Sequence, residues 1–380
     1  MATSYKCPNC SANLLFDADQ QLMTCQYCGS AISPDDIIKR DVHLNSEAMK
    51  QEAERDRLIH GEEEGASAEV GGTDTQASEA TYFSEDETVQ FVCGSCGAAV
   101  ITDKNTSATF CAFCGSPAII AERLVEARKP EYVLPFHYGR ENAIESFFKW
   151  CKAGRFTPID FVKKENVEKM TGLYVPFWLF NSVIDMHFEA QGTKVSSSTS
   201  GNKTTTKTKY YSIKRVRRVC WDKIPFDGAT HIDDKQMEMI APYDYKALKD
   251  FNMAYLSGFF ADRYDLPAEE LEDDLQAKLS VYVDKIFKDS NRGYSSVTNV
   301  RNHTRYYKPD VRYALLPVWV LNYKYRGKTY TFAMNGQTGK TAGEYPISLL
   351  KLLLLGIAIL PAAAIVIKLL IGGLVLGGFF

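Results

Sequence analysis

The segment Cys7–Ser30, CPNCSANLLFDADQQLMTCQYCGS, holds two Cys-x-x-Cys pairs separated by fourteen residues and ends in Gly-Ser. A second segment, Cys93–Ser116, CGSCGAAVITDKNTSATFCAFCGS, aligns with it without a gap at an offset of 86 positions. Two Cys-x-x-Cys turns at this spacing direct four thiolates at one ion, as in a tetrahedral zinc site. Because unrelated cysteines would not recur at the same four positions, the repeat predicts two small four-cysteine zinc ribbons.

The predicted zinc ligands are the eight cysteines of these four pairs. They are Cys7, Cys10, Cys25 and Cys28 in the first ribbon (residues 1–35), and Cys93, Cys96, Cys111 and Cys114 in the second (residues 91–121). The glycine after each distal pair, Gly29 or Gly115, lets the backbone turn tightly behind the sulfurs. Four thiolates leave no open coordination position, so we expect two structural zinc ions that do not activate water.

Other uses of the cysteines are less consistent with the sequence. The N-terminus, MATSYKCPNC, is not a signal peptide, and paired cysteines in a reducing compartment point to metal rather than disulfides. A Cys-x-x-Cys redox motif needs a βαβ context, which neither segment has. Cys151 and Cys220 stand alone and are interpreted as small buried residues.

The composition indicates a folded protein with one biased segment. The chain has 380 residues, 45% apolar residues and a net charge of −3, enough for two or three domains but too little charge for bulk attraction to nucleic acid. Between Glu47 and Glu87 there are 13 acidic and 3 basic residues. Such a segment buries too little apolar surface to offset its ordering entropy, so residues 36–90 are predicted to be a flexible acidic linker.

Residues 122–346 mix helical and strand patterns, which predicts an α+β domain. Arg140–Gly154 has apolar residues at helical spacing and a glycine stop. Leu266–Asp289 has a proline in its first turn, acidic residues after it and lysines near its end, as expected for a capped amphipathic helix. A third helix is predicted within Asp244–Tyr264.

This α+β domain contains an internal duplication. LYVPFWLFN (Leu173–Asn181) and ALLPVWVLN (Ala314–Asn322) match in pattern at an offset of 141, and alternating, strand-like sequence follows each. The favoured interpretation is two strand entries that pack their tryptophans into one core. A ligand groove built from Trp178 and Trp319 is the alternative.

A long, exposed basic β-hairpin is predicted near residues 192–221, because threonine-rich arms flank a polar tip. Six of its cations form a candidate contact for an anionic partner: Lys207, Lys209, Lys214, Arg215, Arg217 and Arg218. A merely solvated hairpin is the simplest interpretation. A contact with anionic lipid or with an acidic partner, including the chain's own acidic segment, is the main alternative, and nucleic acid is less favoured.

Gly336–Thr341, GQTGKT, imitates the end of a nucleotide-binding P-loop. A P-loop needs a glycine at position 334, which is Met334, and a helix after the threonine, where Pro346 follows instead. Asn335-Gly336 between alternating segments is a strong hairpin signal. We therefore expect a β-turn here and no bound nucleotide.

Residues 347–380 carry only two charges, Lys351 and Lys368, and are predicted to anchor the chain in a membrane. Ile347–Ile367 is long enough to cross a bilayer if Lys351 reaches the interface, and Pro361 would kink that helix. A buried core helix is disfavoured because no sequence follows to cover it. Whether residues 369–380 form a second membrane segment stays open. Lysines before the span place the bulk of the chain in the cytoplasm, at the inner or cytoplasmic membrane.

With CPNC…CQYCGS, YVLPFHYGRENAIESFFKW, LYVPFWLF, PYDYKALKDFNMAYLSGFFADRYD and LPVWVLNYKYRGKTYTFAMNGQTGK, the chain resembles the bacterial TFIIB-type zinc ribbon-containing proteins. Some members carry a primosomal-helicase label, but this chain has no helicase ATPase motifs. The resemblance, which runs through most of residues 5–346, implies a membrane-attached adaptor. It also implies partners in envelope-stress systems, namely phage-shock-protein-A-like and SPFH-domain proteins, and no catalytic residues.

Three functions remain open on the sequence. The first is a non-enzymatic, membrane-anchored scaffold whose linker lets the first ribbon search for partners. The second is nucleic-acid binding by the ribbons, which is disfavoured because few cations lie between their cysteine pairs. The third is an enzyme, but the six histidines form no recognisable motif. A polar cleft at His137, His187 or Asp185 would favour it.

Overall fold

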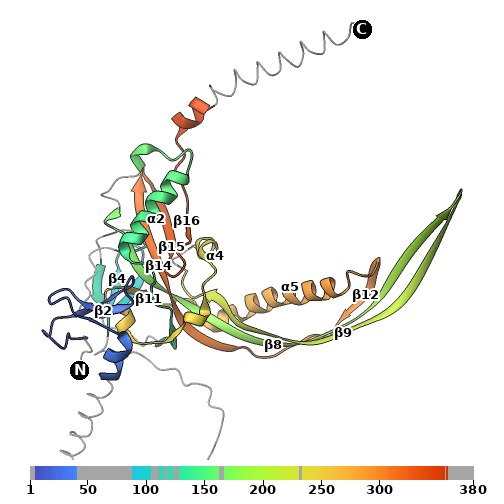
Figure 1. Cartoon of the computed structure of the whole chain (residues 1–380), viewed down its shortest axis with the longest axis horizontal. Helices are drawn as coiled ribbons and strands as arrows, with labels where there is room; N and C mark the ends of the chain where they lie inside the picture. Colours follow the sequence, from blue (N-terminus) through green and yellow to red (C-terminus); the bar gives the residue numbers. More distant parts are fainter. Residues whose placement is uncertain are drawn as a thin grey trace, which may run out of the picture.

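The computed structural model describes residues 5–40, 88–103, 111–113, 116, 119–122, 128–161, 167–230, 233–355 and 357. Within these residues the protein is a mixed α+β structure: a body built on a large sheet, from which one very long hairpin projects (Figure 1). The predicted α+β class is therefore confirmed.

The first cysteine module has its own small antiparallel sheet, in the order β1-β2-β3. Its strands are β1 (Leu14–Asp17), β2 (Leu22–Cys25) and β3 (Ala31–Ile32), and residues 34–40 are helical after them. That helical turn buries Ile37, so part of the predicted linker 36–90 is ordered. Most of that linker, residues 41–87, lies outside the described residues.

The large sheet contains 13 described strands, eight of them in the order β10-β7-β14-β8-β11-β5-β4-β6. These eight are β4 (Thr88–Cys93), β5 (Ala99–Asp103), β6 (Ile119–Glu122), β7 (Tyr132–Val133), β8 (Thr171–Ser200), β10 (Lys249–Asp250), β11 (Phe260–Asp262) and β14 (Asp310–Tyr325). The others are β9 (Lys203–Asp227), β12 (Ser296–Asn302), β13 (Arg305–Tyr306), β15 (Lys328–Asn335) and β16 (Thr341–Gly343). Since β5 pairs with β11, the second cysteine module is an extension of the main sheet rather than a separate unit.

Two of the predicted helices are confirmed. They are α2 (Arg140–Ala153), which ends at Gly154, and α5 (Glu272–Ser290), which follows the 3-10 turn η4 (Ala268–Leu271). The other helical elements are α4 (Asp234–Ile240), η1 (Ile159–Phe161), η2 (Tyr245–Ala247) and η3 (Met253–Leu256).

The third predicted helix, within Asp244–Tyr264, is wrong. This stretch forms the short turns η2 and η3 and the strands β10 and β11. The side chains of Asp244 and Asn252 each accept a hydrogen bond from the backbone N–H two residues later, which starts a new turn. Gly258 then takes φ +90°, and a continuous helix cannot include that conformation.

The duplicated stretches pair with each other at the centre of the sheet. β8 and β14 run antiparallel, with Pro176 opposite Leu315 and Pro317 opposite Tyr174. This reciprocal pairing relates the two copies by a local two-fold axis. The tryptophans are buried in the core, as the favoured interpretation expected: Trp178 is 2% and Trp319 is 4% exposed.

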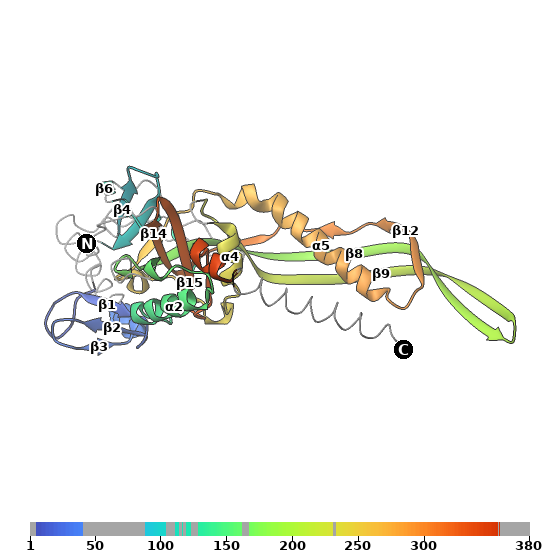
Figure 2. The same ribbon diagram turned by 90° about the horizontal axis from the view of Figure 1, so that it is seen from above.

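The predicted basic hairpin is present and longer than expected. β8 and β9 pair from Phe177–Asp227 out to Ser200–Lys203, with Gly201 in the turn at φ +59°. Figure 2 shows this hairpin, which we call the arm, extending past α5 and β12. Near the body, β12 and β13 pair with β8. Cys220, which was predicted to be buried, is exposed because it lies on the arm opposite Val183, whose side chain also faces solvent.

The first cysteine module packs onto the body. The Ser257 hydroxyl donates to the Leu14 carbonyl at 2.9 Å, and the Asp19 carboxylate accepts from the Gly139 N–H at 2.8 Å. Phe16 lies edge-on to Tyr255, with ring centroids 5.5 Å apart. Because apolar surface and polar groups are matched here, the module is docked on the body in this structure.

The chain leaves the body through a fixed joint. Tyr345 stacks on Trp150 with ring centroids 4.1 Å apart, and the Ser348 N–H donates to the Phe156 carbonyl at 2.8 Å. Residues 349–355 are helical. No helix among the described residues is long and apolar enough to cross a membrane. The predicted anchor, residues 347–380, lies mostly outside the described part.

Candidate metal centres

The four cysteines of the first module form one cluster. Cys7 Sγ lies 3.5 Å from Cys28 Sγ, and Cys10 Sγ lies 3.5 Å from Cys25 Sγ. All four sulfurs are within 4.8 Å of one another. A tetrahedral ion with metal–sulfur bonds of about 2.3 Å needs sulfurs about 3.8 Å apart, so the four thiols could hold one metal ion.

Tight turns aim these sulfurs. In the first, the Ser11 N–H donates to the Cys7 carbonyl at 2.8 Å. In the second, the Gly29 N–H donates to the Cys25 carbonyl at 2.9 Å. Both turns end in the left-handed region, at φ +59° for Ser11 and +73° for Gly29. Glycine, which favours this conformation, occurs only at position 29, so the sequence predicts the turn there but not at Ser11.

The four thiols differ in acidity. Hydrogen bonds from the hydroxyl and the backbone N–H of Ser30 lower the pKa of Cys28 to about 6. A backbone hydrogen bond from Ala12 lowers the pKa of Cys10, but burial and hydrogen bonds with the other thiols outweigh it and raise that pKa to about 12. The Cys28 thiol is thus ready to ionise while the Cys10 thiol keeps its proton. A divalent cation would replace those protons and ionise the whole set.

The second module repeats this arrangement in the part that is described. Cys96 Sγ lies 3.7 Å from Cys111 Sγ, and Cys93, Cys96 and Cys111 form one cluster. The Gly97 N–H donates to the Cys93 carbonyl at 2.8 Å, with Gly97 at φ +78°. The fourth predicted ligand, Cys114, lies outside the described residues. These cysteine clusters could bind metal ions. That the metal is zinc stays a prediction from the sequence.

The body reaches into the second module through Asn322. Its side-chain amide donates to the carbonyls of Ala112 at 2.8 Å and of Phe113 at 2.6 Å, between two predicted ligands. Phe113 also packs against the core of the body. Sequence patterns did not identify Asn322 as a partner of the module, because the two segments are far apart along the chain.

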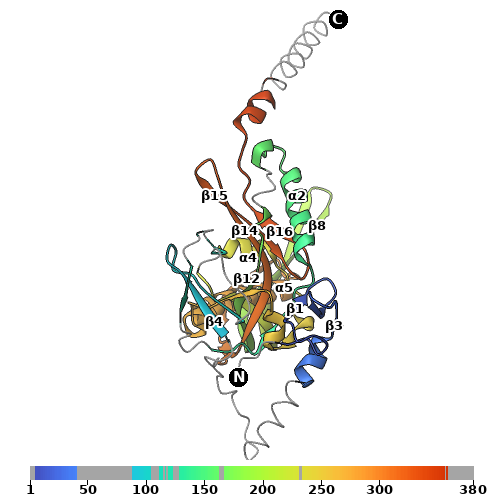
Figure 3. The same ribbon diagram turned by 90° about the vertical axis from the view of Figure 1, so that its left-hand side faces the viewer.

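Tyr27, the equivalent aromatic residue in the first module, does not pack against the body. Tyr27 aligns with Phe113 at the offset of 86, yet 85% of its surface is exposed. The first module docks through Leu14 and Phe16 instead. The two modules lie on opposite sides of the body (Figures 2 and 3).

The structure divides the six cations singled out on the arm. Arg218 makes two hydrogen bonds to the Asp185 carboxylate, at 2.7 and 2.8 Å, which hold the pKa of Asp185 at about 2. Lys214 lies 3.5 Å from Glu189, and Arg215 donates to the Ser290 carbonyl at the end of α5. The remaining three, Lys207, Lys209 and Arg217, are exposed.

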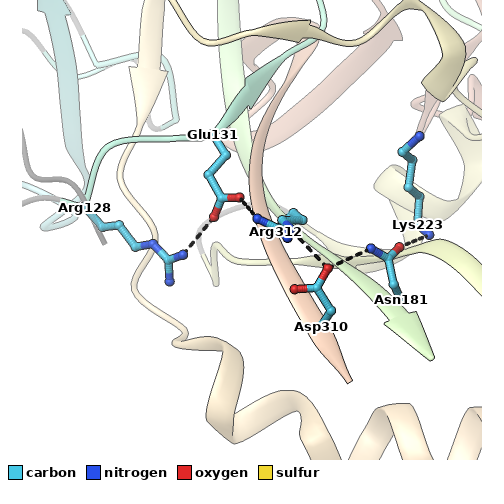
Figure 4. A network of polar contacts seen from close by, with 6 residues as sticks. All are labelled: Arg128, Glu131, Asn181, Lys223, Asp310 and Arg312. Atoms are coloured by element: carbon cyan, nitrogen blue, oxygen red, sulfur yellow. Dashed lines mark hydrogen bonds and ion pairs between the residues drawn. The ribbon is translucent and has the colours of Figure 1, made fainter. Parts of the chain in front are cut away.

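A polar network at the base of the arm was not predicted. Glu131 joins Arg128 and Arg312, each at 2.9 Å, and Arg312 reaches Asp310 at 3.1 Å (Figure 4). Asn181 donates to Asp310 at 3.1 Å and accepts from the Lys223 N–H at 2.8 Å. The network links the segment just before β7 to β8, β9 and β14, and it has no local sequence signal.

The segment that resembles a P-loop forms a turn between β15 and β16, which confirms the hairpin prediction. The Asn335 side chain accepts from the N–H groups of Gln337 and Thr338, both at 2.9 Å. Lys340 donates its ammonium group to the Ala241 carbonyl. The N–H groups of Gln337 and Thr338 are therefore engaged within the turn, and the Lys340 ammonium is engaged by the segment after α4.

Two of the residues at which an enzyme site was considered, Asp185 and His187, contact neighbouring side chains. Asp185 binds Arg218 and accepts from the Tyr307 hydroxyl at 2.7 Å, and His187 lies 3.4 Å from Glu189. A cavity of about 560 Å³ lies elsewhere. Its lining is mostly aromatic and aliphatic, and includes Phe177 and Tyr243.

Comparison with known proteins gives one clear relative. The chain is 34% identical over 349 residues to a Bacillus subtilis (strain 168) protein called "Uncharacterized protein YdjG", over 92% of this chain and 91% of that protein. No family model matches the chain, and no solved structure matches it.

Proposed function

The chain belongs to the family of the Bacillus subtilis protein YdjG, and we propose that it is a non-enzymatic, membrane-anchored adaptor with two structural zinc ions. Its zinc modules recruit cytosolic proteins to the inner face of the membrane. The resemblance to TFIIB-type zinc ribbon-containing membrane proteins supports this proposal and suggests envelope-stress partners, SPFH-domain or phage-shock-protein-A-like.

The exposure of the Tyr27 side chain is the observation that supports the recruiting role. Its equivalent, Phe113, is packed against the body, and a side-chain amide from Asn322 binds the carbonyl of Phe113. Tyr27 has the same position in a zinc turn but faces solvent. Exposed aromatic residues on rigid supports are common anchors of protein interfaces. A partner that repeats the contact would offer an apolar surface and an amide donor.

The described start of the C-terminal segment supports the anchor. Eight apolar residues between positions 347 and 357 are each more than 40% exposed: Ile347, Leu349, Leu350, Leu352, Leu353, Leu354, Leu355 and Ile357. A helix that is apolar all round belongs in a core or a bilayer. Among the described residues no element covers it. The Lys351 ammonium, bound to the Thr157 carbonyl at 2.8 Å, would lie at the membrane surface.

Cell fractionation tests the anchor. The full chain should remain with membranes through an alkaline wash, and a chain that ends at Pro346 should become soluble. Recovery of the full chain in the soluble fraction would contradict the anchor.

Crosslinking in intact cells tests recruitment. A photo-reactive amino acid in place of Tyr27 should crosslink to a cytosolic protein, whereas the same group in place of Tyr210, which is also exposed, should not capture that protein. Crosslinks from position 27 only to the chain itself would count against the adaptor. A steeply salt-dependent affinity of the full chain for DNA or RNA would instead favour the nucleic-acid alternative.

A further inference from the structure

The distal part of the arm stands apart from the rest of the molecule. Beyond Thr193, the last residue of β8 that pairs with β12, no third strand joins β8 and β9. The contacts from other described segments lie at its start: the Val195 N–H donates to the Ser295 hydroxyl at 3.0 Å, and the Lys194 ammonium lies 5.2 Å from the Tyr294 ring centroid. All side chains from Lys194 to Lys209 are exposed. No acidic residue occurs between Glu189 and Asp222, so this surface has no acidic residue of its own.

The register of the hairpin sorts its cations by face. Lys194 lies opposite Lys209, Ser196 opposite Lys207, and Ser200 opposite Lys203. Residues directly opposite in an antiparallel pair point the same way, and successive residues alternate. The same face, nearer the body, buries Ile213 and Ala190. We call the distal surface formed by Lys194, Lys203, Lys207 and Lys209 the lysine face.

The two faces differ in how their charge is balanced. On the opposite face Arg218 pairs with Asp185, and Lys214 lies near Glu189. On the lysine face, no ion pair joins any of the four lysines to another described residue. Like charges directly opposite each other, as at Lys194 and Lys209, destabilise a hairpin. A bound anion would remove that repulsion.

Other groups on this face suit phosphate. Ser196, Ser198, Ser200 and Thr205 place hydroxyl donors between the lysines, as the register shows. From Lys194 and Lys209 to the tip, this face carries no aromatic side chain on which a base could stack, which disfavours single-stranded nucleic acid. The nearest ring on the face, Tyr211, already lies 5.7 Å from the Lys194 ammonium. A flat array of ammonium and hydroxyl groups fits a layer of lipid phosphates better.

We propose that the lysine face binds the headgroups of anionic phospholipids in the membrane that the C-terminal segment enters, and so holds the arm along that membrane. The inference rests on the membrane anchor proposed above. Figure 1 shows the arm curving toward the side from which the described C-terminal residues, in red, leave the body. The attraction should weaken as salt rises, because the Debye length is about 10 Å at 0.1 M and about 3 Å at 1 M.

Hydrogen exchange of the full chain in lipid nanodiscs tests the contact. Discs of phosphatidylcholine alone are compared with discs that contain equal parts of phosphatidylcholine and phosphatidylglycerol, at low and high salt. Backbone amides of residues 194–209 should exchange several-fold more slowly in the anionic discs at low salt. The variant Lys194→Gln/Lys203→Gln/Lys207→Gln/Lys209→Gln should exchange equally in both lipids.

A matched variant controls for net charge. Lys235→Gln/Lys246→Gln/Lys249→Gln/Lys285→Gln removes four exposed lysines of the body and α5, and it should keep the lipid effect. Equal exchange of the unaltered arm in both lipids would overturn the inference. So would protection of the detergent-solubilised chain by duplex DNA in the absence of any lipid effect. Aggregation of the four-lysine arm variant without a lipid effect would show that the lysines protect an exposed strand edge instead.

Flotation of the same preparations separates the two proposals. A chain that incorporates into neutral and anionic discs alike, with no arm protection, refutes the lysine face and leaves the anchor standing. A chain that incorporates into neither contradicts the anchor itself.

Discussion

Trp178 and Trp319 make the same hydrogen bond in the two halves of the duplicated core. The indole N–H of Trp178 donates to the Leu266 carbonyl, and that of Trp319 donates to the Tyr138 carbonyl, both at 2.8 Å. Each acceptor follows a short strand that runs parallel to the central strand of its own tryptophan. β11 pairs with β8, and β7 pairs with β14.

The equivalence extends to the helices after these short strands. α2 follows β7 and buries Phe147 and Cys151, and η4 and α5 follow β11 and bury Leu275 and Leu279. The two units therefore share a short strand, a helix and a long strand. They differ at the end of the long strand, since the first continues into the arm and the second into the β15–β16 hairpin.

Trp178→Phe and Trp319→Phe should destabilise the protein to a similar degree. Each change leaves a carbonyl without its donor in a buried site, which costs about 1–3 kcal/mol. The free energy of unfolding of the full chain in detergent measures the effect. Trp221→Phe, at a half-buried ring stacked on Tyr282, is the control and should cost less. Clearly unequal losses at positions 178 and 319 would contradict the equivalence.

Asn322→Ala should weaken metal binding in the second module alone. The change removes the donor to the carbonyls of Ala112 and Phe113, which orient the turn after Cys111. Loss of such outer contacts typically lowers metal affinity about 10-fold or more. Titration of the zinc-loaded chain with a chelator should release one ion earlier and leave the other unchanged.

Asn181→Ala is the matched control for this change. Asn181 has the same position in the first unit but binds Asp310 and the Lys223 N–H rather than a cysteine module. Both ions should then be released as in the unaltered chain. If Asn181→Ala and Asn322→Ala weaken the same site, the coupling through Asn322 is wrong.

The stability of the protein should depend on the protonation of Asp262. This side chain is 1% exposed, and neither carboxyl oxygen has a hydrogen-bond partner in the described structure. Burial, with the nearby charges of Asp265 and Asp227, raises the pKa of Asp262 well above its usual range. An acid whose pKa rises on folding releases its proton more easily when unfolded. Stability therefore falls as pH rises from about 4 to the raised value.

Asp262→Asn isolates this effect because the amide does not titrate. As the pH rises from about 5 toward the raised pKa, the unaltered chain should lose stability relative to the variant. The loss should be about 1.4 kcal/mol per pH unit while the pH stays below the raised pKa. Urea unfolding at three pH values in this range measures the difference. Parallel pH profiles for the two chains would show that Asp262 does not titrate as its burial implies.

Local patterns were enough to identify the elements of this fold that depend on near neighbours. The Cys-x-x-Cys spacing predicted the cysteine clusters, helical spacing predicted α2 and α5, and Asn335-Gly336 predicted the β15–β16 turn. The prediction of a third helix was wrong because the side chains of Asp244 and Asn252 each cap a new short turn, which interrupts a continuous helix. Hydrogen bonds from such side chains to nearby backbone N–H groups compete with helical hydrogen bonds, and here they outweigh a weak helical spacing of apolar residues.

Contacts between distant segments could not be predicted in this way. Tyr27 and Phe113 occupy the same position in two copies of one motif, and nothing near either residue tells which is buried. Phe113 is packed against the body because β5 pairs with β11 and because Asn322 contacts the second module. On the arm, alternation separates Lys207 and Lys209 from Lys214 and Arg218, but adding Lys194 to the lysine face required the strand register.

Gly336→Ala should destabilise the fold, because Gly336 is buried although it lies in a turn. A Cβ at position 336 would lie 2.6 Å from the Phe136 ring and 2.8 Å from the Pro317 Cβ, and Phe136 is fully buried. The Gly336 carbonyl also accepts from the N–H groups of His137 and Tyr138. Neither neighbour can move freely, so the overpacking should cost about 1–3 kcal/mol.

Gly293→Ala is the control, because a Cβ at position 293 meets no atom within 4 Å and should change stability little. The free energy of unfolding of both variants distinguishes a packed turn from a phosphate loop. A phosphate loop would tolerate the change at position 336 in the absence of nucleotide and lose only nucleotide binding. Unchanged stability in Gly336→Ala would therefore contradict the packing of this turn against Phe136.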